Sequence, residues 1–236
     1  PAVATVFVTE GALCCTGCGQ TFAVENGIPN MLVPQLPRYA EKTREVQGWI
    51  ALAKADGWYE PDPVIDLALP DVVGKLGWDV ETGSNWLGTY HSFTHLLAQH
   101  VRPGLKVLEV GAAKTWAGAY LVERGCTYTG FDMVTDANIG LGRSRFYKEH
   151  RHADYEVVGG DAEFLPFASE QFDLVFAVAA LHHALDLPQM VSELARVAKP
   201  GGIVAGLNEG VRAYWASAND KGQAKEKTYG INEHSY

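Results

Sequence analysis

Several features that define large classes of protein are scarce in this sequence. It has only four cysteines in 236 residues, too few for a disulfide-stabilised scaffold of this length. No stretch approaches the roughly 18 consecutive apolar residues that a membrane span needs, and no charged-then-apolar leader follows Pro1. We therefore expect a cytoplasmic protein with no membrane partner. The start resembles a trimmed fragment rather than a targeting segment.

Basic residues are scarce as well. The formal net charge is −9, from 19 Lys and Arg against 28 Asp and Glu, and no run of Lys or Arg forms a basic stripe. This weighs against binding to nucleic-acid phosphates, so we expect a small-molecule partner and no nucleic acid. None of these features predicts the oligomeric state.

The residues that are present suffice for a buried core, since 47% are hydrophobic, and they fall into three regions. Residues 1–34 carry short β-branched segments at 3–9 and 21–24, separated by turn residues, which predict a small β module. Residues 35–101 are rich in Trp and predict a helical cap or linker. Its clearest helix follows Ser84, a possible N-cap, because apolar residues recur there at spacings of three and four.

The third region, residues 102–236, alternates strands and helices, which is the pattern of a mostly parallel sheet with helices on both faces. We predict strands at residues 106–110, 128–132, 155–158, 172–178 and 203–207. We predict helices at residues 116–124 and 188–198, the second stopped by Lys199-Pro200-Gly201-Gly202. The pattern indicates a doubly wound α/β fold, which we expect to be incomplete after the fifth strand.

Small and acidic residues follow three of the predicted strands. Gly111-Ala112-Ala113 lets a ligand approach the backbone where a helix begins. Asp132 lies 21 residues after Gly111, where an acidic residue can accept hydrogen bonds from both ribose hydroxyls of an adenosine ligand. Asp161 can accept from an adenine amino group while the backbone N–H of Ala162 donates to the ring. Taken singly, each is also compatible with an ordinary turn or a surface carboxylate.

Six segments between residues 107 and 202 occur in an order that resembles the class I S-adenosylmethionine-dependent methyltransferases, particularly the methyltransferase type 11 group. They are Val107-Leu108-Glu109-Val110-Gly111, Gly130-Phe131-Asp132, Gly160-Asp161-Ala162-Glu163-Phe164-Leu165-Pro166-Phe167, Phe172-Asp173-Leu174-Val175, Leu181-His182-His183 and Arg196-Val197-Ala198-Lys199-Pro200-Gly201-Gly202. The resemblance implies a Rossmann-like fold, S-adenosyl-L-methionine as cofactor, and methyl transfer to an O, N or C atom of a small molecule.

The resemblance also implies a set of cofactor-binding residues. They are Glu109, Gly111, Ala112, Ala113, Asp132, Met133, Asp161, Ala162 and Ala177. The family usually has further glycines at the positions of Ala113 and Thr115, so this chain departs from its pattern in the loop that passes the cofactor.

Two histidines and several aromatic or polar residues are candidates for the acceptor side of the site. His182 and His183 follow the fourth strand, where one of them could orient the acceptor or take its proton, although a packing or capping role is the alternative. Aromatic rings could pack on a ring-bearing acceptor. The candidate substrate-binding residues are Tyr90, Asn208, Glu209, Tyr214 and Trp215, with Trp86 as a further wall residue.

A cysteine pair near the start resembles half of a metal site. Cys15-Thr16-Gly17-Cys18 is similar to the second half of a zinc-ribbon module that often precedes such methyltransferase domains. A structural zinc needs four ligands, normally from two such pairs, and Cys14 is poorly spaced to be a third. We therefore expect no bound metal in this chain.

Two other functions are compatible with parts of the pattern. An NAD(P)-dependent oxidoreductase would also use an acidic residue about 20 positions after a Gly turn, but the G-x-G-x-x-G signature is missing. A non-catalytic, methyltransferase-like binding subunit would keep the fold and use the β module to dock a partner. Ala113 and Thr115 favour this last alternative.

Overall fold

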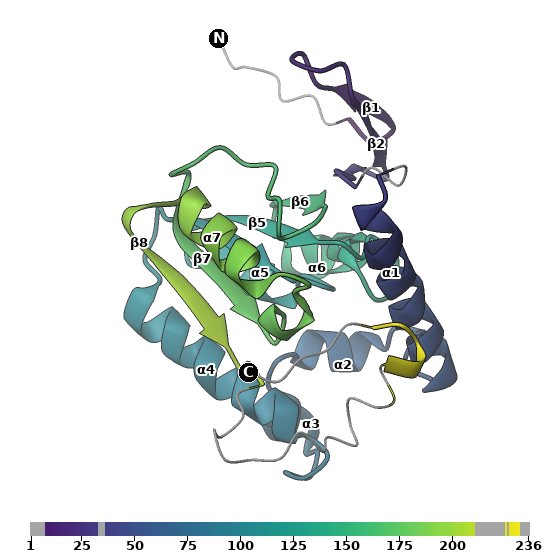
Figure 1. The fold of residues 1–236 in the computed structure, drawn as a ribbon. Coiled ribbons are helices and arrows are strands. Elements are labelled where there is room, and N and C mark those ends of the chain that lie inside the picture. The colour runs from purple at the N-terminus through teal and green to yellow at the C-terminus, as the bar shows by residue number, and fades with distance from the viewer. Residues whose placement is uncertain (1–7, 33–35, 211–224, 226, 232–236) are drawn as a thin grey trace, which may run out of the picture.

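The computed structural model describes residues 8–32, 36–210, 225 and 227–231 of the chain. Figure 1 shows a five-stranded sheet in the centre of the molecule and a three-stranded sheet near the N-terminus. The strands of the central sheet are β4 (Lys106–Val110), β5 (Thr127–Asp132), β6 (Glu156–Gly159), β7 (Phe172–Val178) and β8 (Ala198–Leu207).

The central sheet is parallel throughout, with its strands in the order β6-β5-β4-β7-β8. From β4 the chain runs outward through β5 to β6, then returns to the other side of β4 to form β7 and β8. The strand order therefore reverses between β4 and β7, and doubly wound sheets bind ligands at the carboxyl ends of the strands at such a point. The predicted Rossmann-like α/β fold is confirmed.

Helices cover both faces of this sheet because successive side chains of each strand point to opposite faces. Val107 and Leu174 pack on one face against three helices, whereas Leu108 and Val175 pack on the other face against a fourth; all four side chains are 0% exposed. The helices on the first face are α4 (Ser84–His100), α5 (Trp116–Val122) and α6 (Ser144–Arg151), and α7 (Leu187–Val197) covers the second. Burial on both faces explains the continuous apolar runs of the strands.

The helices that precede the sheet in sequence begin with α1 (Arg38–Ala55), α2 (Pro63–Ala68) and α3 (Val72–Leu76). The start of α2 is set locally, because the Asp62 carboxylate accepts a hydrogen bond from the N–H of Val64 at 2.8 Å and Pro63 occupies the first turn. The predicted cap of α4 is wrong: Gly83 holds the N-cap position and Ser84 is already helical. No side chain caps that helix.

The N-terminal sheet is an antiparallel meander of β1 (Gly11–Cys14), β2 (Thr21–Glu25) and β3 (Ile28–Pro29). Of the predicted strand at 3–9, residues 3–7 lie outside the described residues, and Val8 and Thr9 are not in a strand. The chain after β3 reaches the edge of the central sheet, where the Met31 N–H donates to the Gly159 carbonyl oxygen at 2.7 Å and Asn30 forms a bridge with Gly159. The small sheet is thus tied to β6.

Two stretches near the end of the chain complete the described structure. Helix α7 ends at Val197, one residue before the predicted end, and residues 199–202, predicted as a helix stop, belong to β8, which begins at Ala198. Tyr229 lies directly against α1, where a Cβ on Gly48 would meet its carbonyl oxygen at 2.2 Å, and Ile231 is 2% exposed. Across the described residues, the helices are too short or too polar to cross a membrane.

Candidate active site

A cavity of about 740 Å³ lies at the carboxyl ends of β4, β5, β6 and β7, and its volume is within the range of small-molecule sites. Residues that follow the strands form one side of it, including Gly111, Asp132, Met133, Asp161, Ala162 and Ala180. The helical region forms another side, including Lys42, Trp49, Trp58, Ile65, Asp66 and Trp86. The cavity therefore lies where the strand order reverses, with α1 and α2 over it.

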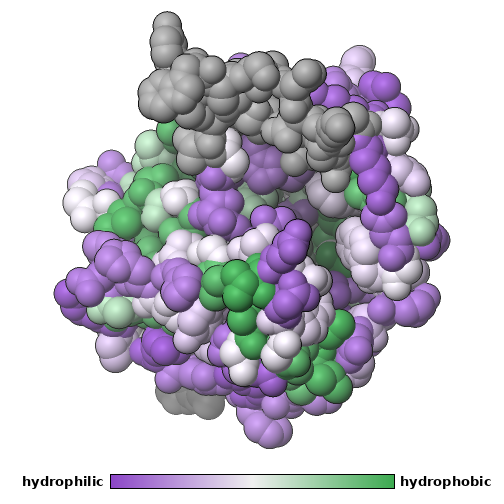
Figure 2. Space-filling model, turned by 90° about the horizontal axis from the view of Figure 1, so that it is seen from below, coloured by the Kyte–Doolittle hydropathy of each residue, from purple (hydrophilic) through white to green (hydrophobic). Residues whose placement is uncertain are grey.

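The mouth of the cavity is marked by lining residues that also contact solvent. Trp58 lines the cavity and is 42% exposed, and Glu60 and Asp62 beside it are exposed as well. Figure 2 shows the molecule from the side on which α3 and α4 lie; its apolar residues form small groups among hydrophilic ones.

The loop after β4 passes the cavity in a conformation that side chains rarely adopt. Ala113 has a φ of 42° and Thr115 a φ of 65°, both in the left-handed region. Three contacts hold the loop there: the Ala113 N–H donates to Asp132 Oδ2 at 2.8 Å, the Thr115 and Tyr155 hydroxyls lie 2.9 Å apart, and the Gly111 N–H donates to the Phe131 carbonyl oxygen at 2.8 Å. At positions 113 and 115 the loop therefore keeps a backbone conformation typical of glycine, although neither residue is a glycine.

Asp132 sits at the end of β5 and faces the cavity. Its two carboxylate oxygens accept hydrogen bonds from the N–H groups of Val134 and Ala113, each at 2.8 Å. Burial raises the pKa of this carboxyl. A carboxylate offers about four acceptor positions, so these two contacts leave it able to accept from two hydroxyls of a ligand.

Asp161 also lines the cavity, within a buried ion-pair cluster that reaches α1. Its Oδ1 accepts from the Glu163 N–H at 3.0 Å and lies 3.7 Å from Lys42 Nζ. Lys42 Nζ in turn donates to Glu163 Oε1 at 2.9 Å, and the same oxygen accepts from the Leu185 N–H at 2.7 Å. A lysine from the helical region therefore balances the two acids that follow β6.

The predicted cofactor-binding residues divide into two groups. Gly111, Ala113, Asp132, Met133, Asp161 and Ala162 line the cavity together. Glu109, Ala112 and Ala177 are not among its described lining residues, and their side chains are buried in the protein interior. Glu109 accepts a hydrogen bond from the Tyr128 hydroxyl, and burial raises the pKa of its carboxyl to about 8.

The two histidines of η2 (Leu181–His183) have different surroundings. His183 lines the cavity, with its ring edge-on to Trp49 at 5.3 Å between centroids and its Nδ1 3.7 Å from Oε1 of the fully buried Glu45. His182 instead places Nδ1 2.9 Å from Glu209 Oε2. Only His183 of the pair is a lining residue.

Most of the predicted acceptor-binding residues that the structure describes do not line the cavity and contact other parts of the protein instead. Tyr90 is not a described lining residue, whereas Trp86 is. The amide of Asn208 donates to the Asn85 carbonyl oxygen at 3.0 Å and to Thr89 Oγ1 at 2.9 Å, tying the end of β8 to α4. Glu209 accepts from the N–H groups of Ala180 and Leu181 and contacts His182. Tyr214 and Trp215 lie outside the described residues.

Sequence reasoning missed most of the residues that the helical region contributes to the cavity. Five of the six tryptophans of the chain line it, and Trp215 is the sixth. Those five are Trp49, Trp58, Trp78, Trp86 and Trp116. The concentration of Trp in residues 35–101 was a signal for four of them, whereas Trp116 lies on α5. Nothing in the local pattern pointed to Lys42 or Asp66.

The cysteines of the N-terminal module are exposed and free at Cys14, Cys15 and Cys18. Backbone N–H groups of Cys18 and Gly17 lower the pKa of the Cys15 thiol. Over the described residues, no group of three or more His, Cys, Asp or Glu side chains is arranged to hold a metal ion.

Comparison with known proteins relates part of this chain to methyltransferases. Residues 108–206 match the family model described as a methyltransferase domain. A fatty-acid O-methyltransferase from Mycolicibacterium smegmatis is 34% identical over 146 residues, which cover 61% of this chain and 48% of that protein. A phthiotriol/phenolphthiotriol dimycocerosates methyltransferase from Mycobacterium ulcerans is 35% identical over 147 residues, with the same coverage of 61% and 48%.

Further similarities extend to a sterol methyltransferase and a solved structure. A sterol 24-C-methyltransferase from Gibberella zeae is 38% identical over 116 residues, 46% of this chain and 29% of that protein. The crystal structure of a putative methyltransferase from Bacillus halodurans has a TM-score of 0.50 and 26% identity, covering 61% of this chain and 62% of that one. The chain spans about half the length of the first curated relatives, 48%. Residues 108–206, which lie between β4 and the end of β8, therefore match a methyltransferase domain.

Proposed function

We propose that this protein transfers the methyl group of S-adenosyl-L-methionine to an apolar small-molecule acceptor bound under the helical region. The observation that carries the proposal is the cavity itself, which joins Asp132 and Asp161 at the strand ends to a set of five tryptophans. The names of three relatives mention a fatty acid, phthiotriol dimycocerosates and a sterol, which supports an apolar acceptor.

The residues of the cavity fit the cofactor. Asp132 retains acceptor positions for two ribose hydroxyls, and Asp161 with the Ala162 backbone would hold the adenine. Gly111 leaves space beside Ala180, since a Cβ there would lie 2.3 Å from the Ala180 Cβ. The positive φ of Ala113 and Thr115 preserves the loop shape that glycines usually give, which weakens the case for a non-catalytic subunit.

The cofactor supplies an electrophilic methyl group on a sulfonium, so the protein's main task is to hold the acceptor in line with it. The tryptophan side chains would bind the apolar body of the acceptor and exclude water from it. His183 would hydrogen-bond the accepting atom or take its proton, while the Trp49 ring and the Glu45 carboxylate orient the imidazole. His182, held by Glu209, would serve to fix the turn.

Ligand binding and turnover test the proposal separately. S-adenosylhomocysteine should raise the melting temperature of the wild type, because a ligand of the native state stabilises it, and Asp132→Ala should abolish the shift. Labelled methyl transfer should favour long-chain fatty acids or sterols over a free sugar. His183→Ala should lower turnover more than His182→Ala does. A preference for the sugar, or NAD binding without any response to S-adenosylhomocysteine, would contradict the proposal.

Three further expectations stand as proposals. The low cysteine content supports a cytoplasmic location. The net charge of −9 supports the lack of a nucleic-acid partner. The change of pattern near residues 34 and 101 supports three units: a small β module, a helical cap and the methyltransferase domain.

A further inference from the structure

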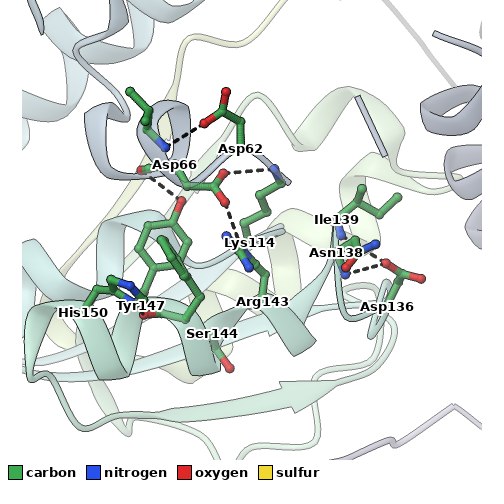
Figure 3. Close-up of polar contacts among 12 residues, drawn as sticks. Asp62, Asp66, Lys114, Asp136, Asn138, Ile139, Arg143, Ser144, Tyr147 and His150 are labelled. Atoms are coloured by element: carbon green, nitrogen blue, oxygen red, sulfur yellow. Dashed lines mark hydrogen bonds and ion pairs between the residues drawn. The ribbon is translucent and has the colours of Figure 1, made fainter. Parts of the chain in front are cut away.

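A buried carboxylate in the helical region contacts the cofactor loop. Asp66 on α2 is 1% exposed, and its Oδ1 accepts from Lys114 Nζ at 3.0 Å while its Oδ2 accepts from Arg143 Nε at 2.8 Å. Figure 3 shows the Asp66 carboxylate between these two cations. Lys114 lies between Ala113 and Thr115 in the loop after β4, so one of the two ion pairs joins α2 directly to that loop.

The third member of the cluster fixes α2 from the side of the sheet. Arg143 ends the 3-10 turn η1 (Leu141–Arg143), and its guanidinium stacks 3.8 Å from the centroid of the Phe146 ring. The Tyr147 hydroxyl donates to the Asp66 carbonyl oxygen at 3.1 Å. Arg143 and Tyr147 therefore hold Asp66 in place without contacting the cofactor loop.

The loop itself needs to be held. A non-glycine residue in the left-handed region is conformationally strained, and this loop has two, Ala113 and Thr115. The Thr115–Tyr155 contact and the Ala113–Asp132 contact hold it from the side of the sheet. The Lys114–Asp66 pair is the contact that comes from the helical region. Strain of this kind persists only where the surroundings over-determine the conformation.

We infer that Asp66 is a positioning residue: through Lys114 it holds the strained loop 111–115 in the conformation that accepts the cofactor. The inference rests on the proposed function, since it assigns that loop to S-adenosyl-L-methionine. Further glycines would let the loop adopt this conformation without strain. In this chain the ion pair with Asp66, from a distant part of the sequence, helps to hold the loop in it instead.

Calorimetric titration with S-adenosylhomocysteine tests the coupling. Asp66→Asn keeps the shape of the side chain and removes its charge, and we expect it to weaken binding about tenfold, which is about 1.4 kcal/mol. Lys114→Met should weaken binding to a similar degree. The double variant should be no worse than either single one, because both changes break the same pair. Additive losses, or Asp66→Asn binding within twofold of the wild type, would overturn the inference.

Two further variants separate positioning from general stability. Arg143→Met removes the other partner of Asp66 and should lower the melting temperature while leaving the affinity within about twofold, because Lys114 keeps its carboxylate. Ala113→Gly relieves strain at a φ of 42°, so in the Asp66→Asn background it should recover most of the lost affinity. If Ala113→Gly does not recover the affinity lost in Asp66→Asn, Asp66 does not act by holding the strained loop, and the inference is overturned.

Hydrogen exchange of the ligand-free protein decides the matter without any cofactor. Amides of residues 113–116 should exchange faster in Asp66→Asn and in Lys114→Met than in the wild type, and unchanged exchange in both would overturn the inference. Lys114 is 20% exposed, so Lys114→Met serves if Asp66→Asn fails to fold. A wild type with a protected loop that binds no S-adenosylhomocysteine would contradict the proposed function instead.

Discussion

The central sheet and the helices over its cavity differ in how much they use buried charge. The sheet is packed on both faces by apolar side chains such as Leu174 and Val175, which are 0% exposed. The helical region contacts the site through buried charges: α1 contributes a cation, Lys42, and α2 an anion, Asp66. Apolar packing is non-directional and determines which surfaces meet, whereas charge pairs require particular atoms to meet. The helices also pack through apolar side chains such as Ala53 on α1 and Ala68 on α2, so they differ from the sheet in adding buried charge pairs to that packing.

The largest effect should come from a cavity in the sheet core. Phe176 is 0% exposed and contacts the Phe93 ring, so Phe176→Ala should lower the free energy of unfolding by about 4 kcal/mol. Val204→Ala on β8, where the side chain is 43% exposed, is the control and should cost less than about 1 kcal/mol. Urea denaturation measures both. Similar losses from the two variants would show that the sheet is not held mainly by its buried faces.

A somewhat smaller loss should follow when the charge of α1 is removed. Lys42→Met leaves Asp161 and Glu163 buried without their cation, which should cost about 3 kcal/mol, because an uncompensated buried charge is expensive. Arg44→Met, at an exposed position of the same helix, should change stability by less than about 0.5 kcal/mol. In hydrogen exchange, the backbone amides of α1 should lose more protection than those of β4 or β7. Equal losses of stability from the two substitutions would show that the buried ion pairs of Lys42 do not stabilise the helical region.

Glu109, a buried acid on β4, should make the stability of the fold depend on pH. The folded pKa of Glu109 is raised to about 8, so its stabilising contribution is fully present below the unfolded pKa near 4.5 and is lost as pH rises through 8. Glu109→Gln does not titrate, so its stability relative to the wild type should rise by up to about 1.4 kcal/mol per pH unit between pH 5.5 and 7.5.

Chemical denaturation at several pH values in this window checks the Glu109 prediction. The exposed Glu149 on α6 provides the control, since Glu149→Gln should differ from the wild type by a constant amount. A constant difference for Glu109→Gln as well would contradict a protonated Glu109 in the folded state.

The smallest effect should come from a charge pair at the surface. Lys225 Nζ lies 2.6 Å from the Asp56 carboxylate, but the two side chains are 53% and 32% exposed. Lys225→Ala should therefore cost less than about 1 kcal/mol, and the loss should shrink in 1 M salt. Thermal melts at low and high salt measure it. A loss as large as that of Lys42→Met would mean that burial is not what separates the two ion pairs.

The same division explains what the sequence could predict. The strands were predictable because apolar runs between turn residues are local, and Asp132 was predictable because a fixed spacing separates it from Gly111. The contacts of the helical region were not, because Lys42 meets Glu163 across 121 positions and Asp66 meets Lys114 across 48. No periodicity connects such residues.

Smaller errors had local causes. The predicted helix stop at 199–202 lies within a strand because β7 offers Phe172 and Leu174 as parallel partners for Ala198 and Ile203 on either side of it. Glu109 and Ala177 were expected at the cofactor, but alternation along their strands does not say how far an interior side chain lies from a cavity. The prediction that Tyr90 lies at the acceptor site has a similar difficulty. Trp86, one turn earlier on α4, lines the cavity, whereas Tyr90 is not a described lining residue.

Gly48 has a consequence for the range of sequences that this fold tolerates. Any side chain at that position would place its first carbon 2.2 Å from the Tyr229 carbonyl oxygen, so the segment 227–231 would have to leave α1. Trp49, which lines the cavity, and the buried Glu45 flank this position on the same helix. Variation at residue 48 should therefore be as restricted as at a residue that binds a ligand, although glycine has no side chain to bind with.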